Sequence, residues 1–375
     1  MKAFIVAARR TAVAPRRGAF AAIEAHDLAA PVLRACLEDA DLAAADVGEV
    51  ILGNALSGGG NVARLAALAA GLPDHVPALT IDRQCCSGLD AIILAARQIE
   101  AGAAESILAG GVESWTRAPL RAVRPRALGE EPVFYDRPPF APARERDPDM
   151  IEAAARLAQS ETISRLAQSG FAVASHAKAL AARERMTAEI VPLAGLDHDA
   201  FARALTPRLS MRAPVVAGQG DCAIDATGVA VEADAAAAVL MVSETVLQQL
   251  GRTGLEFVGG LAVGAAPEQP AMAVVPAVRR LLERTNVAPA DIDRIELMEA
   301  FAAQALSNLA DLGLDPARTN VGGGALSRGH PVGASGAILM VRLFHELLAR
   351  PPGALGLAAI AAAGGLGTAA MVQRS

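Results

Sequence analysis

The run Val76-Pro77-Ala78-Leu79-Thr80-Ile81 is followed directly by Asp82-Arg83-Gln84-Cys85-Cys86-Ser87-Gly88-Leu89. The first run is extended, and from Leu89 to Ile99 apolar residues recur with the i, i+3, i+4 spacing of a buried helix face. The sequence therefore predicts a strand and then a helix, with Cys85 at their junction. The free N–H groups and positive dipole at a helix start favour a thiolate and can hold an oxyanion. Cys85 is thus the candidate nucleophile.

A free cysteine is more commonly a small buried apolar residue, which is the alternative interpretation of Cys85. Its place at the strand-to-helix junction favours the nucleophile. We expect the neighbouring Cys86 to point away from Cys85 and to pack in the core.

A second segment carries a histidine inside a glycine-rich turn that leads into another apolar helix. It reads Asn320-Val321-Gly322-Gly323-Gly324-Ala325-Leu326-Ser327-Arg328-Gly329-His330-Pro331-Val332-Gly333-Ala334-Ser335-Gly336. Glycines allow main chain to approach a ligand or another loop closely. His330 could be a satisfied core histidine, but a rigidly held imidazole is what a cysteine nucleophile needs to lose its proton. The other five histidines lack such a setting, and we expect them to be structural or exposed.

The chain also contains an internal repeat. Residues 31–55 have the same layout as residues 276–300, an offset of 245. With small gaps, the likeness continues from Ser87-Gly88 to Ser335-Gly336 and from Gly110-Gly111 to Gly364-Gly365. Each copy reads as helix, acidic turn, strand, glycine-rich loop, helix and strand, an alternation that favours a layered α/β fold.

Together with Ala109-Gly110-Gly111-Val112-Glu113-Ser114, the two glycine-flanked motifs resemble the thiolase family of coenzyme A acyltransferases. The resemblance begins at residues 3–11 and extends to Gly364-Gly365-Leu366-Gly367-Thr368. It implies a five-layered α/β fold of two repeated halves with an inserted loop domain. It also implies an acyl-CoA substrate, no permanently bound cofactor, and assembly as a homodimer or homotetramer.

We expect three parts in this fold. Residues 1–115 and 223–250 form the N-terminal half, residues 116–222 the inserted loop domain, and residues 251–375 the C-terminal half. Prolines and arginines predict irregular loop over residues 116–149, and apolar spacing predicts helix over residues 150–185. The strand Ala236–Val242 is expected to rejoin the first sheet.

Two positions depart from the family pattern. Ala361 stands where thiolases typically have a second cysteine, the acid/base at the substrate α-carbon, and no cysteine follows Cys222. Met298 stands where members typically have an asparagine that positions a water, and a thioether cannot donate a hydrogen bond. The loop near the expected pantetheine, residues 226–232, also preserves little of the family pattern. The resemblance thus implies intact acylation and impaired Claisen condensation.

The remaining site residues also follow from the resemblance. The N–H groups of Cys85 and Ala363 are expected to form an oxyanion hole, and Ala300 and Phe301 to line the substrate site. Residues 117–146 hold seven arginines against four acids, a balance of +3. They are either a solvated loop or a contact for the phosphates of a nucleotide-bearing substrate, with Arg117 and Arg121 as candidates.

Composition excludes several other classes. A net charge of −6 and 3% aromatic residues argue against nucleic acid as a partner. No apolar run reaches the ~18 residues of a membrane span, and no secretion signal is evident. The four cysteines show neither metal-ligand spacing nor a disulfide framework. A cytoplasmic enzyme without a metal or membrane association is the expectation.

The predicted function is transfer of an acyl group from a thioester, of CoA or of a carrier protein, through Cys85. The acceptor stays open: a carbon nucleophile made by decarboxylation, an acceptor acidic enough to need no second cysteine, or an oxygen, nitrogen or water nucleophile. One alternative is a conventional acetyl-CoA C-acyltransferase in which His330 serves both steps. The other is a partner subunit of a hetero-oligomeric thiolase-like complex.

Overall fold

The computed structural model describes all 375 residues. Its N-terminal half is built on five strands that lie side by side in the order β1, β11, β5, β3, β4. Their bounds are β1 Ala3–Thr11, β11 Ala233–Ser243, β5 Ser106–Glu113, β3 Glu49–Gly53 and β4 Ala78–Ile81. Every residue of β11 and β5 is buried because helices cover both faces. The expectation that Ala236–Val242 rejoins the first sheet is confirmed.

Four strands of the C-terminal half continue the sheet in the order β12, β15, β14, β13. They are β12 Leu255–Gly264, β15 Leu366–Arg374, β14 Leu355–Ala362 and β13 Arg294–Leu297. The two halves join where Phe4 and Ile5 of β1 pair with Glu256 and Leu255 of β12. Two short strands, β2 Ala14–Pro15 and β8 Ile190–Val191, complete an 11-stranded sheet.

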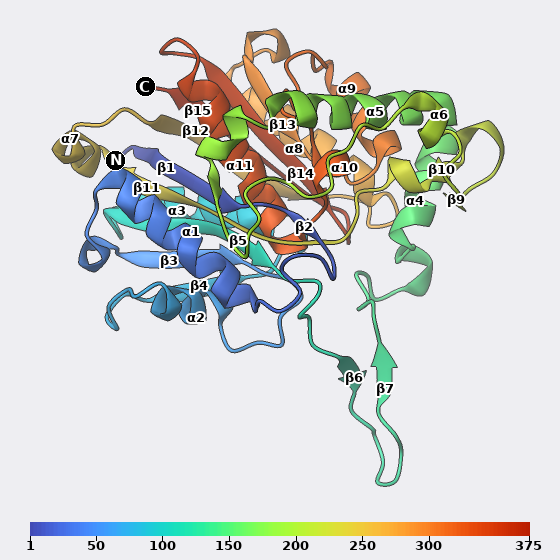
Figure 1. The fold of residues 1–375 in the computed structure, drawn as a ribbon, viewed down its shortest axis with the longest axis horizontal. Helices are drawn as coiled ribbons and strands as arrows, with labels where there is room; N and C mark the ends of the chain where they lie inside the picture. Colours follow the sequence, from blue (N-terminus) through green and yellow to red (C-terminus); the bar gives the residue numbers. More distant parts are fainter.

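The strands of the N-terminal half and those of the C-terminal half form two of the five layers, and helices form the other three (Figure 1). The middle layer is α3 Ser87–Glu100 and α11 Val332–Leu348, which pack on each other and on strands of both halves. Helices α1 Ala25–Ala40 and α2 Val62–Ala69 cover the N-terminal half, and α8 Val274–Thr285 and α9 Ala302–Leu312 the other. Because α11 is covered on nearly all sides, most of its residues are apolar and buried, and its buried Arg342 is paired with carboxylates. The five-layered α/β fold is confirmed.

The repeat is visible in how the helices end. The residue just after α1 is Asp41 with φ of 56°, and the residue just after α8 is Asn286 with φ of 52°. Asp and Asn tolerate this left-handed conformation, which stops a helix. Equivalent short 3₁₀ turns follow, η1 Ala44–Asp46 and η7 Pro289–Asp291. The offset of 245 residues therefore relates the same local structures in both halves.

The insertion lies to one side of the layered body. Its helices are α4 Met150–Ser160, capped by Asp149, α5 Arg165–Ala182, capped by Ser164, and the single turn α6 Pro207–Ser210. Its further pieces are β9 Val215–Ala217, η2 Arg144–Arg146, η3 Arg185–Ala188 and η4 Gly220–Cys222. Strand β10 Ile224–Asp225 and η5 Ala226–Gly228 follow just after the expected boundary at residue 222. The remaining elements outside it are α7 Glu244–Leu250, η6 Pro270–Met272 and α10 Ala325–Arg328. None of the helices is both long and apolar enough to cross a membrane.

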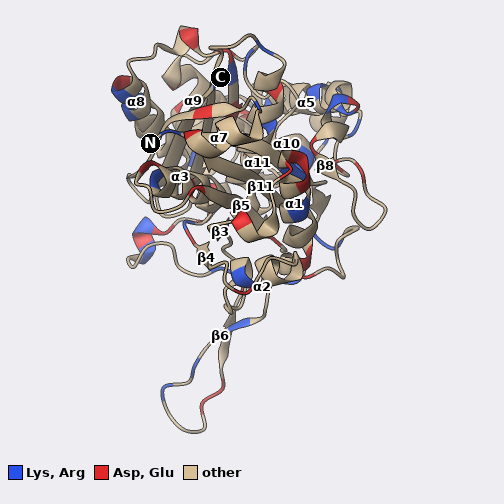
Figure 2. Ribbon diagram, turned by 90° about the vertical axis from the view of Figure 1, so that its left-hand side faces the viewer, with Lys and Arg blue, Asp and Glu red and all other residues tan.

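The prediction of irregular loop over residues 116–149 is wrong in part. Strands β6 Arg121–Val123 and β7 Val133–Tyr135 pair as an antiparallel hairpin that projects from the body (Figures 1 and 2). Val133, Phe134 and Tyr135 have high strand propensity, which the surrounding prolines and arginines obscured in the sequence.

A buried ionic cluster ties the insertion to both halves. Arg10 of β1 binds Asp199 at 2.6 Å and Glu189 at 2.7 Å, and Glu189 also binds Arg342 of α11. Burial raises the pKa of Glu189, but Arg342 and Arg10 outweigh it and lower the pKa to about 2. Because the partners are buried together, removing one would leave an uncompensated charge in the core.

Candidate active site

Cys85 lies in a tight turn between β4 and α3. Gln84, just before it, adopts the left-handed φ of 51°. The Ser87 hydroxyl accepts a hydrogen bond from the N–H of Arg83 at 2.7 Å and donates one to the carbonyl of Gln84 at 2.6 Å. These bonds brace the turn in a conformation that costs free energy for a non-glycine residue. Cys85 keeps part of its surface exposed, whereas Cys86 is fully buried, as expected for a packing residue.

His330 is held by main-chain contacts ahead of α11. Its N–H donates to the carbonyl of Val231 at 2.7 Å, and its carbonyl accepts from Nε1 of Trp115 at 3.1 Å. Gly329 before it has φ of 113°, and a Cβ at this residue would lie 2.8 Å from the Cβ of Ala233. Only glycine fits this position, so the glycine of the motif sets the place of the imidazole.

The two motifs meet at these residues. Nε2 of His330 lies 3.1 Å from Sγ of Cys85, and Nδ1 lies 2.7 Å from the hydroxyl of Ser335. The Ser335 hydroxyl donates its proton to the carbonyl of Pro331 at 3.0 Å, so it accepts the proton of Nδ1. This leaves the lone pair of Nε2 directed at the thiol, the tautomer that a general base requires.

Burial keeps this pair neutral at rest. It raises the pKa of Cys85 to about 12, and it lowers the pKa of His330 to about 4. The N–H groups of Cys85 itself and of Ala363 oppose the shift of the thiol, because both donate toward its sulfur. The site can therefore stabilise negative charge at the sulfur or beside it, once the proton moves to the imidazole.

The N–H of Ala363 comes from the turn between β14 and β15. Gly364 and Gly365 in this turn have φ of 78° and 73°. One N–H donor thus belongs to the N-terminal half and the other to the C-terminal half. The structure brings together four expected features, Cys85, His330 and the two N–H groups.

The two departing residues, Met298 and Ala361, pack in different core clusters. Met298 is 2% exposed in the core cluster that also contains Cys86 and packs against Cys85. Its carbonyl accepts from the amide of Gln304 at 3.1 Å, so its main chain is fixed while its side chain fills apolar space. Ala361 is the penultimate residue of β14 and pairs with Gly367 of β15.

Ala300 and Phe301 lie where the main core meets a smaller cluster that contains residues of the insertion. Ala300 packs against both clusters. Its carbonyl accepts from the N–H of Ala230 at 3.0 Å. Phe301 is 7% exposed and belongs to the smaller cluster, with Ala155 of the insertion and Ile224.

The arginine-rich segment is partly paired with acids. Arg117 binds Glu24 at 2.8 Å, and Arg121 donates to the carbonyl of Ala55 at 3.1 Å. Neither contacts Cys85 or His330. Arg137 and Arg146 likewise bind Asp147 and Glu268. Arginines nevertheless recur along the projecting hairpin (Figure 2).

Two residues that support this site, Glu113 and Ser335, were not predicted from the sequence. The buried carboxylate of Glu113 accepts hydrogen bonds from the N–H of Gly333 at 2.9 Å, the N–H of Ala55 at 3.0 Å and the amide of Asn54 at 2.8 Å. It thereby joins the start of α11 to the loop after β3. Ser335, which fixes the imidazole tautomer, was also missed, although its five-residue spacing from His330 was a usable signal.

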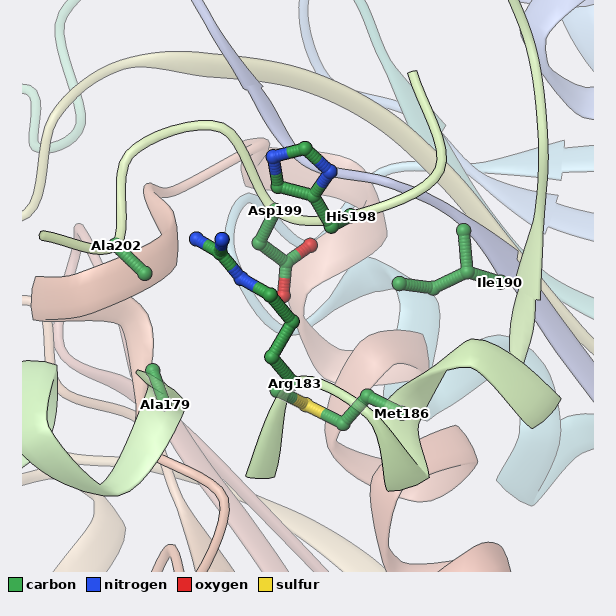
Figure 3. Close-up of a pocket in the computed structure, with 7 residues that line it drawn as sticks. All are labelled: Ala179, Arg183, Met186, Ile190, His198, Asp199 and Ala202. Carbon is green, nitrogen blue, oxygen red and sulfur yellow. The ribbon is translucent and has the colours of Figure 1, made fainter. Parts of the chain in front are cut away.

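Two cavities lie near the insertion and near the nucleophile turn. The first holds only about 10 Å³ and is lined by Arg183, Met186, His198 and Asp199, with three small or aliphatic side chains (Figure 3). It contains none of the expected site residues. The second, of about 180 Å³, includes Arg83 and Asp90 beside the nucleophile turn.

Family models place these observations in a known class. Residues 3–245 match the thiolase N-terminal domain, and residues 255–374 match the thiolase C-terminal domain. The chain belongs to the thiolase family and is an acyltransferase.

Individual relatives agree with this class over the whole chain. YhfS of Bacillus subtilis, provisionally named an acetyl-CoA C-acetyltransferase, is 40% identical over 100% of this chain and 99% of its own. VraB of Staphylococcus aureus, with the same provisional name, is 36% identical over the same shares. The crystal structure of a Bacillus anthracis acetyl-CoA acetyltransferase superposes with a TM-score of 0.90 at 32% identity, covering 100% of this chain and 99% of that one.

Proposed function

We propose that the protein forms an acyl-enzyme on Cys85 from an acyl-CoA, with His330 as proton shuttle, and passes the acyl group to an acceptor. The observation that carries the proposal is the 3.1 Å contact between Nε2 and Sγ, with Nδ1 oriented by Ser335. A directed neutral imidazole beside a thiol is the arrangement that nucleophilic catalysis by cysteine needs.

The acylation step follows from the geometry. The thiol proton moves from Sγ to Nε2 as the sulfur attacks the thioester carbonyl. The carbonyl oxygen gains negative charge, which the N–H groups of Cys85 and Ala363 stabilise. The tetrahedral intermediate then collapses, the carbon–sulfur bond to CoA breaks, and the imidazolium returns its proton to the departing thiolate.

Condensation of a second, unactivated thioester is the weaker half of this site. It requires removal of a proton from the α-carbon and stabilisation of the enolate. Ala361 has no titratable group, and the thioether of Met298 donates no hydrogen bond. We therefore assign the enzyme an acceptor that does not depend on a second cysteine.

A conventional acetyl-CoA C-acyltransferase is the second candidate, and the names of the relatives favour it. In that case His330 abstracts the α-proton as well. The two candidates differ in how fast the enzyme exchanges the α-protons of acetyl-CoA with solvent.

We also propose assembly as a homodimer or homotetramer, with a hetero-oligomer as the alternative. Strand β4 lies at an open edge of the sheet, and Leu79 on it and Leu65 and Leu68 on the adjacent α2 are each about 40% exposed. An unpaired edge beside exposed leucines is a typical place for another chain to bind.

Intact-protein mass spectrometry after incubation with a panel of acyl-CoA thioesters tests the proposal. We expect one acyl group added per chain and mapped to Cys85. The proposal would be contradicted if no thioester of the panel changed the mass of the protein and none released free CoA.

A further inference from the structure

Asp90 is a buried carboxylate that the proposed mechanism does not use. It lies in the first turn of α3, five residues after the nucleophile, and is 7% exposed. Its neighbours Cys86 and Leu89 are fully buried and apolar. A carboxylate in such a place is costly unless it is paired, so its partners indicate what it does there.

Those partners come from two separate segments. Arg83 of the nucleophile turn places Nη1 3.4 Å from Oδ1 and Nε 3.2 Å from Oδ2 of Asp90. The hydroxyl of Thr368 on β15 donates to Oδ1 at 3.1 Å. A single carboxylate therefore contacts one segment of the N-terminal half and one of the C-terminal half.

Each segment carries one of the two N–H donors. Arg83 is two residues before Cys85, and its own N–H is fixed by Ser87. Thr368 follows the Ala363–Gly365 turn on β15, whose first residues Leu366 and Gly367 pair with Ala362 and Ala361 of β14. The distance between the N–H donors of Cys85 and Ala363 thus depends on how the nucleophile turn packs against β15.

We propose that Asp90 is a positioning residue that holds the N–H groups of Cys85 and Ala363 at the spacing required to bind the oxyanion. The inference rests on the proposed acyl-enzyme function. Oxyanion donors act through preorganised geometry, and a displacement of about 1 Å at a reacting group can cost ~10²-fold in rate. A device that fixes both donors therefore controls the acylation rate without touching the substrate.

The charge of Asp90 makes the device dependent on pH. Burial raises the pKa of Asp90 to about 6, against the opposing effects of Arg83, Thr368 and Arg97. The Cys86 thiol also faces it, and Asp82 lines the same cavity. Above pH 6 the carboxylate is ionised and pairs with Arg83; as the pH falls through 6 it gains a proton and this pairing is lost.

The test measures acylation of Cys85 by acetyl-CoA in a rapid-quench experiment with intact-mass detection. We expect Asp90→Asn, a neutral isostere, to lower the maximal acylation rate about 10- to 100-fold while half-saturation by the donor changes less than about twofold. The wild type should show a fall in rate near pH 6, separate from the loss near pH 4 caused by His330, and Asp90→Asn should lack it.

Further variants make the result specific. Arg83→Gln, at a side chain that is 42% exposed, should give the same loss of rate and of the pH 6 step. Asp39→Asn, which removes an ion pair with Arg9 away from the site, should change neither. The losses of acylation rate in Thr368→Val and Asp90→Asn should be less than additive in the double variant, because both substitutions remove the same contact between these two residues.

The outcomes separate the two proposals. If Asp90→Asn and Arg83→Gln only lower the melting temperature and leave the acylation rate and its pH profile unchanged, Asp90 is structural and the inference is wrong. If Asp90→Asn does not fold, Arg83→Gln and Thr368→Val decide by the same measurements. A wild type that forms no adduct on Cys85 would instead overturn the proposed function and this inference with it.

Discussion

At the scale of single residues, the decisive arrangement is a neutral thiol beside a neutral imidazole. Burial favours the uncharged form of both groups, so the ion pair exists only as the sulfur attacks. Cys85 and His330 could be predicted from their motifs because each follows from local sequence. Ser335 and Glu113 could not be, because their roles depend on contacts across the fold.

The assignment of the nucleophile predicts different behaviour for the adjacent cysteines. Cys85→Ala should abolish the acyl adduct, since no other thiol contacts His330. Cys86→Ala should keep it, at a cost of about 1 kcal/mol in stability from the lost buried sulfur. Peptide mapping of the adduct checks both, and an adduct on Cys86 would overturn the assignment.

The assignment of His330 as the general base predicts a lower acylation rate and a change in its pH dependence when His330 is replaced. His330→Ala should slow acylation by about 10²–10⁴-fold, the usual loss for a general base. Because burial lowers the pKa of His330 to about 4, the wild-type imidazole is neutral and active above that pH and is protonated below it. Rapid-quench assays from pH 4 to 9 measure the acylation rate of both proteins. A rate that does not respond to the substitution would show another route to the thiolate.

At the scale of elements, three turns hold the candidate catalytic groups: the turn at Cys85, the turn at His330 and the turn at Ala363. The strand-to-helix junction at Cys85 was predictable from periodicity. The β6–β7 hairpin was not, because its strand residues are few and lie among prolines and arginines. The partners of Arg117 and Arg121 were also beyond sequence reasoning, since Glu24 and Ala55 are distant in the chain.

The turn before His330 predicts a specific effect of one methyl group. Gly329→Ala should reduce stability by about 1–3 kcal/mol and slow acylation, because the φ of 113° and the contact with Ala233 force the turn to shift. Gly353→Ala is the matched control, with φ of 88° but no atom within 4 Å. Thermal unfolding and acylation assays compare the two variants, and Gly329→Ala should acylate more slowly than Gly353→Ala. Equal acylation rates in the two variants would mean that the turn does not place the imidazole.

The arginine-rich segment predicts a role in donor binding. Replacing Arg117, Arg121 and Arg124 together by glutamine should weaken the binding of acyl-CoA and reduce its dependence on salt, since a guanidinium suits phosphates. Isothermal titration at two ionic strengths measures this. Unaltered affinity and salt dependence would reduce these arginines to surface charge.

At the scale of the whole molecule, the site exists because the two repeated halves face each other. Cys85 lies just before α3 and His330 just before α11, the helices that correspond to each other in the two copies. The repeat and the layered fold could be predicted from sequence. The meeting of the halves at one site is a property of the three-dimensional arrangement, with the middle-layer helices α3 and α11 packed side by side.

The central claim is that this molecule acylates Cys85 but lacks the group that makes a carbanion from an unactivated thioester. Mass spectrometry of acetyl-CoA incubated with the enzyme in deuterated water, measured beside acylation of Cys85, tests this most directly. We expect rapid adduct formation with very slow exchange of the acetyl protons, and faster exchange in the double variant Ala361→Cys and Met298→Asn. Rapid exchange by the unaltered enzyme would contradict the claim and make the conventional acetyl-CoA C-acyltransferase the better account.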